Sequence, residues 1–158
     1  MGTDDANHQF TILIPLAVGI GAVKCTIFVH ALALATTVNL LRYKKGRGCL
    51  GADASKDLAI VALVISVAFV VRLIEIGLWA ILFVLCEEFQ ELGTAYYHSA
   101  VNYRTSGYGD LLLPPAWRSL GSLEATNGPV MFGVSAAMVF AGVQPLVLAR
   151  FGISEGER

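Results

Sequence analysis

Six consecutive residues in the second half of the chain, Thr105-Ser106-Gly107-Tyr108-Gly109-Asp110, have types and an order that suggest chemistry. Glycines on both sides of one tyrosine allow the backbone to adopt left-handed conformations at alternate residues. A chain in that conformation can direct successive carbonyl oxygens the same way. A ring of such oxygens can replace the water shell of a desolvated cation. The segment is therefore a candidate cation-binding backbone.

A short apolar and aromatic segment, Leu92 to Arg104, comes directly before this motif. Crossing a bilayer takes about 20 helical residues, and a segment of this shorter length is typical of a re-entrant or interfacial helix. The alternative is that Gly107 and Gly109 only make a turn, with Tyr108 and Trp117 as anchors at the membrane interface. That alternative leaves the short 92–104 segment unexplained.

Three long apolar runs must position the motif: about Phe10 to Leu41, Leu58 to Cys86, and about Ala125 to Ala149. Each exceeds the roughly 20 residues that span a hydrocarbon core. An open chain crosses lipid only as a helix, because lipid offers no partner for backbone amides. The sequence therefore predicts an all-α membrane protein with three transmembrane helices and one re-entrant helix.

The composition agrees with a membrane environment. Of the 158 residues, 56% are hydrophobic and 15% are charged, against about 25% charged residues in a typical globular domain. The net charge of −1 lacks the basic excess of nucleic-acid-binding proteins. These numbers exclude a soluble globular protein, a disordered chain and a nucleic-acid-binding module.

The residue types argue against catalysis. There is no Ser/His/Asp set, no paired acid and base carboxylates in a plausible pocket, no metal-ligand cluster and no phosphate-binding loop. The three cysteines, Cys25, Cys49 and Cys86, lie in separate segments without metal-ligand spacing. We expect no enzymatic activity, no cofactor and no soluble substrate.

The basic residues predict the orientation, since loops rich in Lys and Arg stay cytoplasmic. Most of them lie in the 42–57 loop or after the third run, and few lie in the 87–124 segment. We expect a multi-pass protein of the plasma (inner) membrane, with the N-terminus outside and the C-terminus cytoplasmic. The acidic leader of the first run indicates a retained helix and not a cleaved signal peptide.

The TSGYGD motif closely resembles the TVGYGD signature of potassium-channel selectivity filters, and it follows the same order of span, short helix, filter, linker and span. The resemblance covers about Leu58 to Ala149. The residues downstream of the motif look like small bacterial two-span proteins of the ion-transport type: Leu113-Pro114-Pro115, Trp117-Arg118, Glu124, Asn127-Gly128 and Met131-Phe132-Gly133. The resemblance implies that residues 58–158 form a two-span pore domain with an outer helix, pore helix, filter, inner helix and short tail. Residues 1–57 would add an extracellular N-terminus, an extra span and a basic cytoplasmic loop.

The resemblance also implies a function, passive and potassium-selective cation conduction. Backbone carbonyls of Thr105, Ser106, Gly107 and Tyr108 would bind K⁺ as the permeant ion, and the Thr105 hydroxyl would add the innermost ring of ligands. Asp110 would lie at the outer mouth of the pore. The alternative is that Asp110 is an ordinary polar residue in a turn. One chain supplies one strand of such a filter, so the pore requires a homotetramer in the lipid.

Two positions depart from the family pattern. Ser106 replaces the usual valine and keeps the backbone role. Arg104 stands where a second threonine is common, at the end of the short helix whose negative dipole favours a cation. Four guanidinium groups at the filter entrance would repel cations strongly at low dielectric.

Three alternatives follow for Arg104. It turns away and pairs with Glu87, Glu88 or Glu91; it obstructs the pore and leaves a non-conducting channel-like subunit; or it alters the selectivity.

Two residues of the third span are candidates for gating. Gly133 resembles the hinge glycine on which inner helices bend, and the alternative is a small residue that allows close helix packing. Pro145 removes a helix hydrogen bond, which predicts a bend near the inner end.

Five further titratable or charged residues lie in apolar segments. Lys24, Arg72 and Glu75 are costly in lipid and should face protein or water. Counted from the outer ends, Lys24 and Glu75 have similar depths, and Arg72 is one turn from Glu75. We expect a structural ion cluster that fastens the first span to the second. His30 is expected to be packed, whereas His98, nearer the outer mouth, is the better pH-sensing candidate.

Replacing Glu75 with Gln should loosen the assembly, because it removes the anion of the expected cluster. The measurement is detergent stability of the oligomer, and unchanged stability of the variant would count against the cluster.

Overall fold

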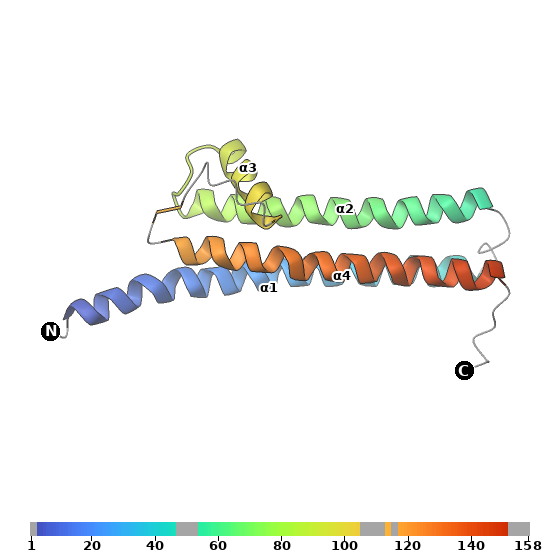
Figure 1. Ribbon diagram of the computed structural model, residues 1–158, viewed down its shortest axis with the longest axis horizontal. Helices are drawn as coiled ribbons and strands as arrows, with labels where there is room; N and C mark the ends of the chain where they lie inside the picture. Colours follow the sequence, from blue (N-terminus) through green and yellow to red (C-terminus); the bar gives the residue numbers. More distant parts are fainter. Residues whose placement is uncertain (1–2, 47–53, 105–112, 115–116, 152–158) are drawn as a thin grey trace. The chain divides into compact units, whose positions relative to one another are not determined.

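The computed structural model describes residues 3–46, 54–104, 113–114 and 117–151. The described chain contains four α-helices: α1 (Thr3–Gly46), α2 (Ala54–Leu85), α3 (Leu92–Tyr103) and α4 (Arg118–Phe151) (Figure 1). The described residues form no strand, which confirms the predicted all-α class for this part of the chain.

Three of the helices are long and apolar enough to cross a membrane. The candidate spans are Leu13–Tyr43, Ser55–Leu85 and Arg118–Gln144, with 31, 31 and 27 residues. At 1.5 Å per residue each exceeds the roughly 30 Å of a hydrocarbon core. The prediction of three long apolar helices is confirmed, and they fit a multi-pass membrane protein.

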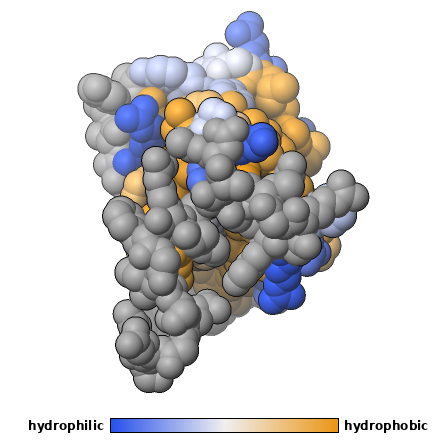
Figure 2. All heavy atoms as spheres, turned by 90° about the vertical axis from the view of Figure 1, so that its right-hand side faces the viewer, coloured by the Kyte–Doolittle hydropathy of each residue, from blue (hydrophilic) through white to orange (hydrophobic). Residues whose placement is uncertain are grey.

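Large apolar side chains project outward from all three spans. Phe28 of α1, Phe69 of α2 and Phe140 of α4 are 69%, 63% and 69% exposed. Hydrophobic residues, drawn in orange, cover much of the described surface in Figure 2. A water-soluble monomer rarely exposes such extended apolar surface, so these faces suit lipid or a partner chain.

The third span begins earlier than the sequence predicted. α4 starts at Arg118 and not at Ala125, because the polar turns before the apolar run already face the protein. Leu120 and Glu124 are fully buried there. A count of consecutive apolar residues ends at Glu124 and therefore misses two helical turns. α4 continues to Phe151 and is helical through Pro145.

The chain groups into two compact units, and each contains part of every long helix. Unit 1 comprises Met1–Phe28 and Leu73–Phe132, and unit 2 comprises Val29–Arg72 and Gly133–Arg158. The two units group residues that are close in space. They do not test the predicted boundary between residues 57 and 58, which stays a prediction.

Unit 1 has its core around the short helix α3. Trp79 and Phe83 of α2, Ala95 of α3 and Leu120 of α4 are all 0% exposed and belong to one apolar cluster. The inward face of α3 also carries His98, Ser99 and Tyr103, a spacing that places them on one side of the helix. Side chains of α1, including Val18 and Val23, pack against this cluster. Parts of all three long helices therefore line the place where α3 sits.

Unit 2 has a smaller core made by Leu41 of α1, Val64 and Ala68 of α2, and Met138 of α4. Gly142 of α4 faces this core, since a Cβ added there would lie 3.2 Å from Val64 Cγ1 and 3.5 Å from Leu41 Cδ1. A small residue at this position allows close helix packing.

Within unit 1, α4 meets the end of α3 at Gly128. A Cβ added at Gly128 would overlap the carbonyl oxygen of Tyr103 and lie 2.9 Å from its carbonyl carbon. Only glycine leaves room for this backbone contact. Gly133, in contrast, has nothing within 4 Å of its Cβ position.

We predict that Gly128→Ala separates α3 from α4 and destabilises the protein. Overpacking of this kind costs roughly 1–3 kcal/mol, and for a chain of this size the thermal midpoint falls by about 2–4 °C per kcal/mol. Thermal unfolding in detergent measures the change. Gly133→Ala is the matched control, and equal midpoints for both variants would contradict the contact.

Candidate functional site

The predicted filter residues Thr105, Ser106, Gly107, Tyr108, Gly109 and Asp110 lie outside the described residues. The K⁺ ligand set assigned to their carbonyls therefore stays a prediction. The structure describes the chain on either side, through Arg104 before the motif and from Leu113 after it.

The helix that leads into the motif is α3. The segment predicted as a short helix over 92–104 is helical from Leu92 to Tyr103, with Arg104 as its C-cap residue. Its 12 residues measure about 18 Å, too short for a membrane span. The existence of this short helix is confirmed.

The last residue of α3 is anchored by hydrogen bonds to two neighbouring helices. Tyr103 is 4% exposed. Its hydroxyl donates to Glu75 Oε2 of α2 at 3.0 Å and accepts from Asn127 Nδ2 of α4 at 3.4 Å. The same Asn127 Nδ2 donates to Thr26 Oγ1 of α1 at 2.9 Å. Tyr103, two residues before the motif, is therefore bonded directly to α2 and α4 and is linked to α1 through Asn127.

A second polar contact lies one residue earlier on α3. Asn102 Nδ2 donates to Glu124 Oε2 at 2.6 Å and to the carbonyl oxygen of Gly121 at 2.8 Å, both on α4. Glu124 is fully buried, and Ser99 faces the same carboxyl group. This contact holds α3 against the first turns of α4.

The chain that leaves the motif is anchored on the same part of α4. Leu113 is 8% exposed, and its carbonyl oxygen accepts a hydrogen bond from Arg118 Nε at 3.4 Å. A Cβ at Gly121 would lie 2.8 Å from Leu113 Cδ1, so Leu113 sits directly against α4. Asn102, before residues 105–112, and Leu113, after them, are thus both held by the first turns of this helix.

Most of these anchoring residues were not predicted from the sequence. Polar residues inside or next to apolar runs were the available signal, because they need protein partners in lipid. The sequence did not reveal the anchoring roles of five residues: Thr26, Asn102, Tyr103, Glu124 and Asn127.

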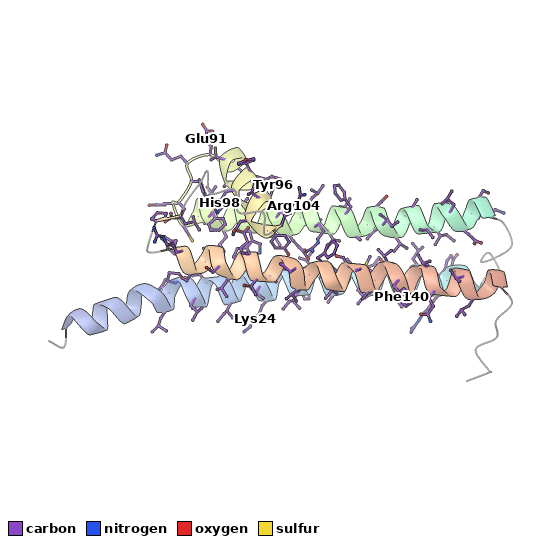
Figure 3. The ribbon with its side chains drawn as sticks, in the orientation of Figure 1. Lys24, Glu91, Tyr96, His98, Arg104 and Phe140 are labelled. Carbon is purple, nitrogen blue, oxygen red and sulfur yellow. The ribbon has the colours of Figure 1, made fainter. Side chains whose placement is uncertain are left out.

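Arg104 is exposed at the C-terminal end of α3. Glu91, one of its expected partners, is the N-cap residue at the opposite end (Figure 3), which at 1.5 Å per residue is about 20 Å away along the helix. This distance places Glu91 of the same chain out of reach of Arg104. Glu87 and Glu88 lie in the turn that ends α2, where Glu87 has a left-handed φ of 61°.

The structure does not bring together all members of the predicted ion cluster. Lys24 is exposed and points away from α2 (Figure 3). Glu75 is fully buried and accepts the Tyr103 hydrogen bond. Arg72 is half-buried on α2. Similar depth along two helices did not make Lys24 and Glu75 neighbours, because each helix is also rotated about its own axis.

The other predicted positions also have places in the structure. Gly133 has open space at its Cβ position, so close packing within the chain does not explain that glycine. His30 is buried beside Ser135, with 3.4 Å between Nε2 and Oγ. His98 packs edge-on against Phe83 and beside Phe89, at ring-centroid distances of 5.3 and 5.1 Å. Both histidines are packed within the protein.

Comparisons with protein-family models, curated proteins and solved structures find no match. The functional interpretation therefore rests on the residues and on the geometry around α3.

Glu88 provides a pH-dependent prediction next to this site. Burial raises the pKa of its carboxyl group above the ordinary value of 4.5. A raised pKa means that the folded protein favours the protonated form. The contribution of Glu88 to stability is therefore fully present below about pH 4.5 and is lost as the pH rises through its folded-state pKa.

We expect Glu88→Gln to raise the thermal midpoint in detergent by about 1–3 °C at pH 8 and to have no effect near pH 4. The neighbouring exposed Glu87→Gln is the control. A difference between Glu88→Gln and the parent protein that is the same at both pH values would contradict the assignment.

Proposed function

We propose that the protein is a potassium-selective cation channel, formed by four copies around a central pore in the plasma (inner) membrane. In this proposal α2 is the outer helix, α3 is a re-entrant pore helix and α4 is the inner helix. The N-terminus is extracellular and the C-terminus is cytoplasmic. The backbone carbonyls of residues 105–108 bind K⁺ as it passes.

The observation that carries this proposal is the anchoring of the described residues that flank the TSGYGD segment. Tyr103 is tied to Glu75 and Asn127 before the motif, and Leu113 packs on Gly121 after it. A carbonyl-lined ion site requires a backbone held in place, since displaced oxygens no longer replace the water shell of the ion. The surrounding helices hold the flanking residues Tyr103 and Leu113 in this way.

The short helix α3 supports the same function electrostatically. The C-terminus of a helix carries a partial negative charge of about half an electron. α3 ends directly before the motif, so this charge favours a cation at the start of the filter. Arg104 stands at that end and competes for the same charge.

Exposed apolar side chains on the three long helices fit the expected surroundings. Faces that carry Phe28, Phe69 and Phe140 suit lipid or the neighbouring subunits of a tetramer.

Potassium flux into liposomes that contain the purified protein tests this function. We expect K⁺ uptake that exceeds Na⁺ uptake and that is lost in Gly107→Ala, because the left-handed conformation costs an alanine roughly 1–2 kcal/mol in every subunit. Gly93→Ala is the matched control, since its Cβ position on α3 is open. Intact tetramers of the parent protein without flux would contradict the proposal.

Arg104→Thr tests the second candidate function, a channel-like subunit obstructed by arginine. The position of Arg104 as the C-cap of α3 is the observation that raises this candidate. Flux from both the parent protein and the variant indicates that the side chain turns away from the pore. Flux from the variant alone indicates obstruction, and an altered K⁺ to Na⁺ ratio indicates a role in selectivity.

A further inference from the structure

We propose that the first span, α1, positions the pore helix through a hydrogen-bond chain that starts at Thr26. This inference rests on the proposed function, because the pore helix is α3 and the position in question is that of its last residue, Tyr103. In this proposal α1 is part of the framework of the filter. Thr26 is a positioning residue that acts through Asn127.

The four hydrogen bonds that link these residues each have a defined donor and acceptor. The Asn127 amide group donates to Tyr103 Oη and to Thr26 Oγ1. The Tyr103 hydroxyl donates a hydrogen bond to Glu75 Oε2, and the Thr26 hydroxyl donates one to the Val23 carbonyl oxygen at 2.8 Å. Each hydroxyl can therefore only accept from Asn127. This sequence of donors fixes the orientation of the amide group.

Burial makes these hydrogen bonds necessary, because the polar groups have no access to replacement partners in the solvent. Thr26 and Glu75 are 0% exposed, and Asn127 and Tyr103 are 4% exposed. Neither lipid nor bulk water can supply replacement partners at such depth. An amide hydrogen that loses Thr26 is left unsatisfied, which is costly in an apolar environment.

Loss of the Thr26 hydroxyl would therefore act on Tyr103. The terminal torsion of asparagine is broad, so its amide group can turn when one partner disappears. A turned amide presents its carbonyl oxygen, in place of an N–H group, to the hydroxyl of Tyr103 or Thr26. At Tyr103 the hydroxyl would then donate to Asn127 and would no longer donate to Glu75. The last residue of α3 then loses its hydrogen bond to Glu75 or to Asn127.

Close packing brings α1 and α4 together on the same face. A Cβ at Gly19 would lie 2.5 Å from Leu123 Cδ1 and 3.0 Å from Leu120 Cδ1. Gly19 lies seven residues before Thr26, or about two helical turns, and so on the same side of α1. The hydrogen bond between Thr26 and Asn127 thus forms where the two helices approach closely.

A double-mutant cycle tests this coupling. Thr26→Val and Tyr103→Phe each remove one hydroxyl with little change of shape, and the double variant removes both. The measurements are the ratio of K⁺ to Na⁺ flux in liposomes and the thermal midpoint in detergent. We expect each single variant to lower the flux ratio about three- to tenfold. The double variant should be no worse than Tyr103→Phe alone.

Three further variants separate positioning from a general structural effect. Thr26→Ser keeps the hydroxyl and should restore the flux ratio. Thr36→Val removes an exposed hydroxyl of α1 that donates to Leu32 of its own helix. Tyr96→Phe removes an exposed hydrogen bond from α3 to the Leu73 carbonyl oxygen. Both controls should change the ratio less than about twofold.

The outcomes distinguish this inference from the proposed function. Additive effects of Thr26→Val and Tyr103→Phe, or an unchanged flux ratio in Thr26→Val, would overturn the inference even in a conducting protein. If the parent protein carries no flux, the proposed function fails, and the thermal midpoints decide the coupling. Non-additive shifts then support a link from α1 to α3, and additive shifts overturn it.

Discussion

The hydrogen bonds of Asn127 are the constraint on which the arrangement of unit 1 depends. One amide group donates both to α1 at Thr26 and to α3 at Tyr103, and Tyr103 continues to Glu75 of α2. Apolar side chains tolerate rotation of one helix against another, since their attraction has little direction. Buried polar groups do not tolerate it, because each needs a partner at a defined distance and angle. The three long helices therefore have a defined rotation in this unit.

The face of α4 that carries Asn127 also supports the chain around the motif. Glu124 accepts from Asn102, and Gly128 allows the backbone of α4 to touch the carbonyl group of Tyr103. These residues recur at the three- and four-residue spacing of one helix face. The polar residues on this face form directional hydrogen bonds with α3, and the glycines allow the backbones to approach closely. α4 therefore supports the described residues on both sides of the TSGYGD segment.

Local features of the sequence were sufficient to predict the helices. Runs of apolar residues predicted three long helices, and the short segment from Leu92 predicted α3, because helix length and apolar content are properties of neighbouring residues. The start of α4 was misplaced at Ala125 because Glu124 is a charged residue type whose burial depends on Asn102. Asn102 lies 22 residues earlier in the chain, and no local pattern links the two.

The sequence by itself determined the element order, the apolar character of the spans and the filter-like motif, all of which follow from residue types and their spacing. Only the tertiary structure decided which polar residues meet. Lys24 and Glu75 have matching depths but do not meet, whereas Thr26, Tyr103 and Asn127 do. Depth along a helix can be counted in residues, but contact also depends on the rotation of each helix. That rotation is a collective result of packing and hydrogen bonding among all the helices of the unit.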